Sequence, residues 1–256
     1  MRAKAQFGLV IVLTAWCAVA STAQQPRGCT VSSSISPVKQ SYIFQEPIRL
    51  NMTLSNLGRE PVTIMHSYPY VSDQLSFSES NQHLPETEEY ANRQRWGGKS
   101  IPRTLDSGGT WTLSIFLQTY TASLSPGLHK LDYEVVIPCV QGPGLITAAA
   151  KGMVSIRVEP PNPGQLRKIV GEYGRQASAG DSEAFEALLS MDSPYVVPEL
   201  EALIQGSNWQ RALQTLSRFK GDPAAERIVS ETVQSKVPTH KIAGLRVLGR
   251  MERTDC

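Results

Sequence analysis

The stretch Glu159-Pro160-Pro161-Asn162-Pro163-Gly164 separates residues with a strand-like pattern from residues with a helix-like pattern. Proline has no backbone N–H to give to a sheet, and it biases the residue before it towards extended backbone. Prolines at three of four successive positions therefore stop both a strand and a helix. We predict a linker over residues 159–164 between two modules of different construction.

Residues 24–158 alternate apolar and polar side chains, which is typical of strands with one face in water. The apolar positions are Ile48, Leu50, Met52 and Leu54; Trp111, Leu113, Ile115 and Leu117; Leu131, Tyr133, Val135 and Ile137; and Val154, Ile156 and Val158. Turn signals such as Ser107-Gly108-Gly109 separate these segments. Short strands joined in this way predict an antiparallel β-sandwich domain.

Residues 165–256 place apolar side chains at the i, i+3, i+4, i+7 spacing of amphipathic helices. The predicted buried rows are Phe185, Leu188 and Leu189; Val196, Leu200, Leu203 and Ile204; Trp209, Ala212, Leu213, Leu216 and Phe219; Ile228, Val229 and Val233; and Ile242, Leu245 and Leu248. The predicted N-caps are Asp181, Ser193, Ser207 and Asp222. Short turns between these segments predict antiparallel helical hairpins. The first segment, residues 165–177, either docks the helices on the sandwich or is a plain first helix of the stack.

Residues 1–23 have the pattern of a signal peptide. Arg2 and Lys4 precede an apolar run over residues 7–20, and Ser21-Thr22-Ala23 supplies small residues for cleavage before Gln24. A transmembrane anchor is the alternative, but the run is shorter than the roughly 20 apolar residues that cross a bilayer. We expect a secreted or periplasmic protein with no membrane span after signal removal.

The charge of the chain argues against two classes of partner. The formal net charge of +2 falls to zero once Arg2 and Lys4 are removed. Nucleic acids and anionic membrane surfaces attract proteins with a clustered basic excess, which this chain lacks. A protein partner is the remaining expectation, and neither a cofactor nor a metal is expected.

The cysteines fit an oxidising compartment. Cys29 keeps the strand parity of Val31, and Cys139 keeps that of Ile137, so both side chains should face the core. We predict a disulfide between Cys29 and Cys139, with two unpaired buried thiols as the alternative. Cys256 is left over, and it either links two chains into a dimer or is an incidental terminal thiol.

The segment from Tyr68 to Arg103 breaks the strand alternation and predicts a long loop rich in aromatic and arginine side chains. Such side chains supply many interface hot spots, and long loops on a rigid scaffold often carry recognition. The candidate binding residues are Tyr68, Tyr70, Tyr90, Arg93, Arg95 and Trp96. The alternative is that the aromatic rings pack under the loop as a satellite core.

Four stretches resemble two known families. Gln45-Glu46-Pro47-Ile48-Arg49-Leu50 and Leu124-Ser125-Pro126-Gly127 resemble bacterial immunoglobulin-like domains of secreted proteins. Val197-Pro198-Glu199-Leu200 and the later Lys241 to Gly249 resemble a HEAT-type, armadillo-like helical repeat, although the repeat offset is shorter than the usual roughly 40 residues. These resemblances imply an immunoglobulin-like sandwich followed by a short α-solenoid with a scaffolding and protein-binding role.

No catalytic motif is evident. The four histidines are scattered, and no nucleophile elbow, phosphate loop or dinucleotide fingerprint occurs. We therefore expect an exported, non-enzymatic binding or scaffold protein of the cell envelope. One alternative is a hydrolase or protease-inhibitor-like protein with a site in the Tyr68 to Arg103 loop, and another is a structural envelope protein without a specific ligand.

Overall fold

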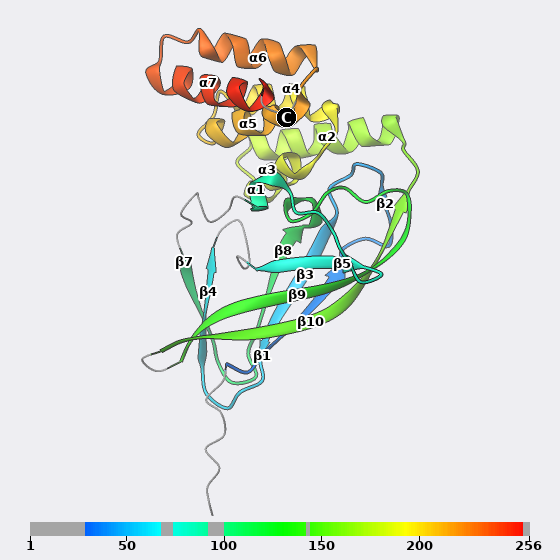
Figure 1. Cartoon of the computed structure of the whole chain (residues 1–256), viewed down its shortest axis with the longest axis vertical. Helices are drawn as coiled ribbons and strands as arrows, with labels where there is room; N and C mark the ends of the chain where they lie inside the picture. The colour runs from blue at the N-terminus through cyan, green and yellow to red at the C-terminus, as the bar shows by residue number, and fades with distance from the viewer. Residues whose placement is uncertain (1–28, 68–73, 92–99, 142–143, 253–256) are drawn as a thin grey trace, which may run out of the picture.

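The computed structural model describes residues 29–67, 74–91, 100–141 and 144–252. A β-rich part comes first and a helical part follows it (Figure 1). The predicted α+β chain, with strands before helices, is confirmed at this level. Strand β10 (Gly144–Glu159) ends beside Pro160, and helix α2 (Pro163–Ser178) begins at Pro163.

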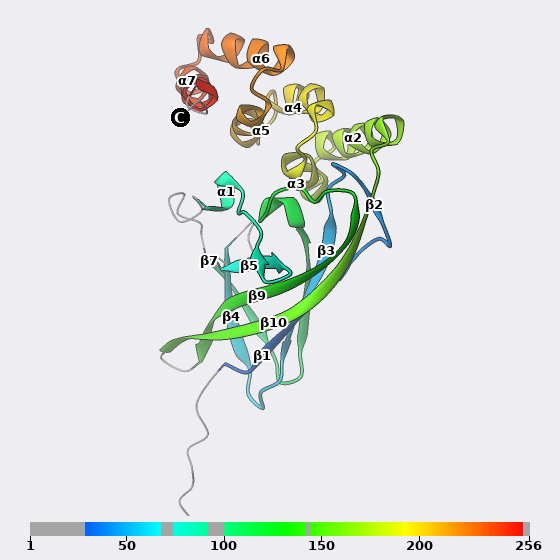
Figure 2. The ribbon, with the colours of Figure 1, turned by 45° about the vertical axis from the view of Figure 1, so that its right-hand side comes forward.

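The strands of the described residues form two sheets. The first has the order β1 (Val31–Pro37), β3 (Arg49–Asn56) and β8 (Thr110–Phe116), with both pairs antiparallel. The second has the order β2 (Tyr42–Ile43), β10, β9 (Gly127–Gln141), β4 (Val62–Ser67) and β7 (Ser100–Leu105). Strand β5 (Leu75–Glu79) also pairs with β9, and β6 (Gln82–His83) pairs with β5. The long strands β9 and β10 curl strongly around this part (Figures 1 and 2).

The two sheets share one apolar core. In β3 the inward positions Leu50, Met52 and Leu54 are fully buried, and they belong to the same core as Ile64 of β4 and Leu131 of β9. Alternation along a strand sends these side chains to one face, as the sequence pattern predicts. The predicted inward positions of β8 differ at its start, because Trp111 and Leu113 are only partly buried.

The helical part continues from α2 through a series of short helices. They are α3 (Ser182–Ser190), the 3-10 turn η3 (Pro194–Val196), α4 (Val197–Leu203), α5 (Trp209–Thr215), the 3-10 turn η4 (Leu216–Phe219), α6 (Pro223–Val233) and α7 (Pro238–Glu252). Both ribbon views place α3 next to the β-rich part and α6 farther away (Figures 1 and 2). This part has a core of its own, separate from that of the sheets.

Two of the four predicted helix caps are confirmed. A carboxylate oxygen of Asp181 accepts backbone N–H bonds from Glu183 and Ala184 at 2.8 and 3.1 Å. Asp222 caps α6 in the same way. Ser193 holds the N-cap position of η3, but its side chain makes no cap bond. The prediction is wrong for Ser207, because Asn208 holds the N-cap position of α5.

The predicted buried row of α7 is wrong for Ile242 and Leu245, whereas Leu248 is partly buried against the helical core. Ile242 and Leu245 are 51% and 49% exposed, whereas Gly244, Val247 and Met251 are buried. The physical reason is a close approach to α6, since a Cβ on Gly244 would lie 2.9 Å from the backbone nitrogen of Val233. Only glycine permits this contact, so the side of α7 that carries Gly244 packs against α6.

The two glycines of α7 give a matched test of this packing. Gly244→Ala is expected to lower the free energy of unfolding of the helical part by about 1–3 kcal/mol, because the new methyl group would overpack backbone atoms of α6. A Cβ on Gly249 meets nothing within 4 Å, so Gly249→Ala should raise stability by up to about 1 kcal/mol through helix propensity. Urea unfolding followed by circular dichroism at 222 nm measures both changes. Equal effects of the two substitutions would contradict the close approach.

The contact between the two parts is rich in charged groups. Arg49 of β3 donates to a carboxylate oxygen of Glu183 in α3 at 2.9 Å. Ser123 donates to Asp192 at 2.6 Å, and Arg218 of η4 forms ion pairs with Asp192 and with Glu89 of the β-rich part at 3.5 and 3.7 Å. Helix α3 also lies against β8.

Tyr173 of α2 lies near this contact and gives a pH-dependent prediction. Burial, and next the charge of Glu46, raise the pKa of Tyr173 to about 12. An unfolded tyrosine ionises near pH 10. Between about pH 10 and 12 the unfolded chain therefore loses this proton while the folded chain keeps it, so stability falls as the pH rises.

Tyr173→Phe removes this contribution. The urea midpoint of the natural chain should fall more steeply between pH 9 and pH 11.5 than that of the variant. Other tyrosines titrate in both proteins, so the difference between the two curves isolates Tyr173. Parallel curves would show that the buried hydroxyl is not the group responsible.

Candidate binding surface

The structure places Tyr90, one of the predicted binding residues, in the core. Tyr90 lies in the short helix α1 (Glu88–Ala91), and its side chain is fully buried. Its ring centroid lies 4.9 Å from that of Tyr120, and its hydroxyl accepts the backbone N–H of Leu75 at 2.6 Å. The expectation that Tyr90 contacts a partner is therefore corrected, because its ring packs inside while its polar tip is satisfied.

The other predicted binding residues, Tyr68, Tyr70, Arg93, Arg95 and Trp96, lie outside the described residues. Phe77, from the same stretch of sequence, is buried beside Tyr120 with ring centroids 6.3 Å apart. Tyr90 and Phe77 are therefore buried, as the alternative expects, although both belong to the core shared by the two sheets and not to a separate satellite core.

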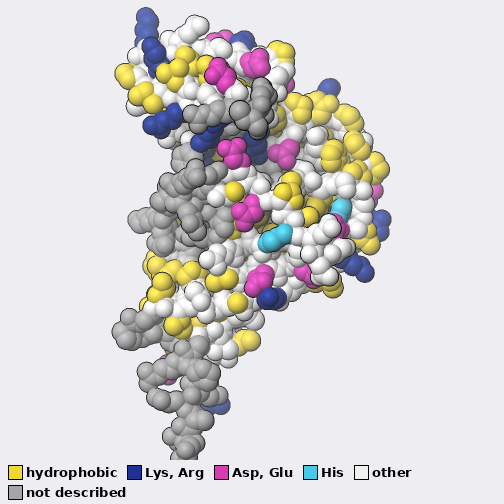
Figure 3. Space-filling model, in the orientation of Figure 1, with side chains coloured by type: hydrophobic (Ala, Val, Ile, Leu, Met, Phe, Trp, Pro, Cys, Tyr) yellow, Lys and Arg dark blue, Asp and Glu magenta, His cyan; other side chains and the backbone are white. Residues whose placement is uncertain are grey.

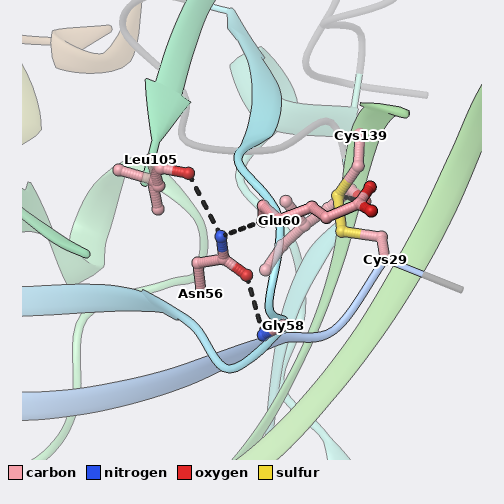
Figure 4. The surroundings of a disulfide bond; sticks show 7 residues. Cys29, Asn56, Gly58, Glu60, Leu105 and Cys139 are labelled. Atoms are coloured by element: carbon pink, nitrogen blue, oxygen red, sulfur yellow. Dashed lines mark hydrogen bonds between the residues drawn. A yellow bond between two sulfur atoms is a disulfide. The ribbon is translucent and has the colours of Figure 1, made fainter. Parts of the chain in front are cut away.

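The predicted disulfide between Cys29 and Cys139 is formed, with Cα atoms 6.2 Å apart (Figure 4). Cys139 is fully buried in β9, as its strand parity predicts. The bond ties the residues just before β1 to the second sheet. Cys256 lies outside the described residues, so the predicted dimer through it stays a prediction.

The histidines contact unrelated partners. His66 of β4 packs against Trp111 with ring centroids 4.8 Å apart, and burial followed by the charge of Arg103 lowers its pKa. His129 contacts Glu79 at 3.0 Å, and His240 packs against Trp209 at 4.1 Å between centroids. Among the residues that the structure describes, no group of three or more His, Cys, Asp or Glu side chains is arranged to hold a metal ion.

The outer side of α7 carries an apolar row in which Ile242 and Leu245 are exposed. Ile242, Leu245 and Gly249 lie three and four residues apart, so they share one side of the helix. This side is opposite to Gly244, Val247 and Met251, which pack inward. Val237, just before the helix, is 48% exposed and extends the apolar surface.

Basic side chains flank this row. Lys241 lies on one side of it and Arg246 on the other, and both are exposed. Neither forms an ion pair with any carboxylate of the described residues, whereas Arg227 of α6 contacts both Glu201 and Glu231. Figure 3 shows hydrophobic and basic side chains side by side at this end of the molecule. We call the surface formed by Val237, Lys241, Ile242, Leu245, Arg246 and Gly249 the α7 face.

The helical pattern of the sequence does not predict the α7 face, because it places Ile242 and Leu245 in the core. The signal in the sequence that could indicate this surface is a helical segment with apolar or small residues on two sides. A helix that is apolar on two sides is expected to pack on both. Among the described residues, no helix is long and apolar enough to cross a membrane.

Comparisons with known proteins support no family assignment. No protein-family model and no curated protein matches the chain. Among solved structures, PapD-like domain 7 of human CEP192 is 13% identical with a TM-score of 0.28, covering 62% of this chain and 100% of that one. AggA, the major subunit of aggregative adherence fimbriae type I from Escherichia coli, is 10% identical with a TM-score of 0.25, covering 50% and 95%.

A third similar structure is native alpha-2-macroglobulin from Escherichia coli, from domain MG7 to the C-terminus. It is 11% identical with a TM-score of 0.31, and the match covers 89% of this chain and 53% of that chain. These TM-scores are too low to carry an argument about family or function, so the function is argued from the chain itself.

Proposed function

We propose that the chain is an exported, non-enzymatic scaffold protein of the cell envelope that binds another protein through its helical part. The observation that carries this proposal is the α7 face, where Ile242 and Leu245 are half exposed on a helix already packed on its other side. In a HEAT-like stack each helix pair buries its apolar face against a neighbour, and an open apolar face is a place for a partner.

The rest of the molecule fits a scaffold that presents the α7 face to a protein partner. An immunoglobulin-like β-rich part would hold the helical part through Arg49, Glu183, Asp192 and Arg218, which join the two parts. The Cys29–Cys139 disulfide supports an extracytoplasmic location, because such bonds persist in oxidising compartments.

Affinity capture with matched variants tests this function. The mature chain is immobilised and exposed to an envelope extract, and the captured protein is purified and titrated against the chain. Ile242→Glu with Leu245→Glu should abolish saturable, stoichiometric binding. Leu128→Glu with Met153→Glu, which alters side chains 59% and 62% exposed on the β-rich part, is the control and should retain it.

Binding that survives the α7 change would contradict the proposal. Substrate turnover by the purified chain would also contradict it, because the proposal assigns no reaction to the protein.

A further inference from the structure

The α7 face also carries information about the partner. We propose that it binds an amphipathic helix of another protein whose apolar row is flanked by Asp or Glu side chains. This inference rests on the proposed function and deepens it by naming the chemistry of the partner.

The spacing of the apolar row favours a helix over an extended segment. Ile242, Leu245 and Gly249 follow the i, i+3, i+7 spacing of one helix side, and they form a row along the axis of α7. A partner helix placed along this row would pack as neighbouring helices pack, with axes about 8–10 Å apart. An extended strand repeats every two residues and does not match this row.

Gly249 is the position at which the proposed partner helix comes closest to α7. A glycine destabilises a helix relative to alanine, so its presence calls for a packing reason. Gly244 has such a reason in the backbone of α6, where a Cβ would lie 2.9 Å from the nitrogen of Val233. The missing Cβ of Gly249 faces open space among the described residues, so packing within this part of the chain does not explain it.

The charges of Lys241 and Arg246 favour a partner with acidic side chains on both sides of its apolar row. Lys241 and Arg246 lie on opposite sides of the apolar row and have no carboxylate partner among the described residues. An ion pair with a partner carboxylate at such an exposed site adds modestly to the affinity. A second copy of α7 would bring the same basic side chains together, so like-charge repulsion disfavours self-association through this face.

Two designed peptides test the inference directly. Both are 21-residue helices with leucine in the apolar row; one carries glutamate at the flanking positions and the other carries lysine there. Each is labelled, and its binding to the full mature chain is followed by fluorescence anisotropy. The glutamate peptide should bind saturably and at least about tenfold more tightly than the lysine peptide, because two ion pairs replace two repulsions.

A charge-reversal variant tests whether Lys241 and Arg246 determine which peptide binds. Lys241→Glu with Arg246→Glu should weaken binding of the glutamate peptide about tenfold and strengthen that of the lysine peptide. Gly249→Leu should weaken both peptides by filling the site of closest approach. The circular dichroism spectrum of each variant checks its folding, which substitutions at exposed positions should preserve.

The outcomes separate this inference from the function on which it rests. Absence of peptide discrimination, while a captured protein still needs Ile242 and Leu245, overturns the acidic helix and leaves the binding function standing. If the two peptides are not discriminated and the captured protein does not need Ile242 and Leu245, both proposals are overturned. Sedimentation with phosphatidylglycerol vesicles that needs Lys241 and Arg246, or a dimer that dissociates in the Ile242→Glu variant, would replace the helix by a lipid surface or a second copy.

Discussion

Replacing Cys29 and Cys139 by alanine is expected to lower the free energy of unfolding of the β-rich part by about 4–5 kcal/mol. The two residues are 110 positions apart, so their bond removes many conformations from the unfolded chain. This loss is a large share of the roughly 5–15 kcal/mol that stabilises an ordinary domain. Hydrogen exchange measured at increasing urea, in peptides from β3 and β9, reports on the β-rich part alone.

Reductant and a second cysteine variant complete this test. The natural chain should be destabilised by reductant, and the double alanine variant should not respond to it. Cys256→Ser keeps the Cys29–Cys139 bond, so it should behave as the natural chain does. Equal stability of the natural chain with and without reductant would show that the bond adds nothing to the fold.

The local patterns of the sequence predict the order of strands and helices well. The alternation in β3 and the capping aspartates of α3 and α6 depend on neighbours close in the chain, so they can be read from the sequence. The same holds for the inward parity of Cys139. The linker prolines act through their own backbone chemistry, and the chain changes from strand to helix beside them.

The orientation of α7 could not be predicted in this way. The helix offers two sides to its neighbours, one with Ile242 and Leu245 and one with Val247 and Met251. The choice between them depends on how closely α6 approaches Gly244, which is a distance between elements and not a local pattern. The candidate binding surface follows from this choice, so it became visible only in three dimensions.

Tyr90 shows the same limit for a single side chain. An aromatic residue that follows two glutamates suits both an exposed contact and a ring buried under a loop. The contact with Tyr120 and the N–H of Leu75 decide for burial, and both come from strands or turns that are distant in the chain. Composition indicates that such residues are important, whereas the tertiary fold determines whether they face a partner or the core.

Asn56→Ala is expected to cost about 3 kcal/mol of stability, because one buried side chain joins two turns. The sequence marks Asn56 only as the start of a turn. In the structure its amide group donates to the carbonyls of Glu60 and Leu105 at 2.8 and 3.1 Å (Figure 4). It also donates to the carbonyl of Asp106 at 3.0 Å. Its side-chain oxygen accepts the backbone N–H of Gly58 at 2.9 Å.

These bonds connect the turn after β3 with the turn between β7 and β8. Asn56 therefore ties the first sheet, which contains β3, to β7 at the edge of the second sheet. Asn56 is only 2% exposed, and alanine would leave buried acceptors without a donor, at about 1–3 kcal/mol for each such group. Ser107→Ala is the matched control, since Ser107 donates to Gly58 in the same turns but at an exposed position. Urea unfolding followed by tryptophan fluorescence should show a loss below about 1 kcal/mol for this control. If both variants lose the same stability, the buried amide is not what holds the two turns together.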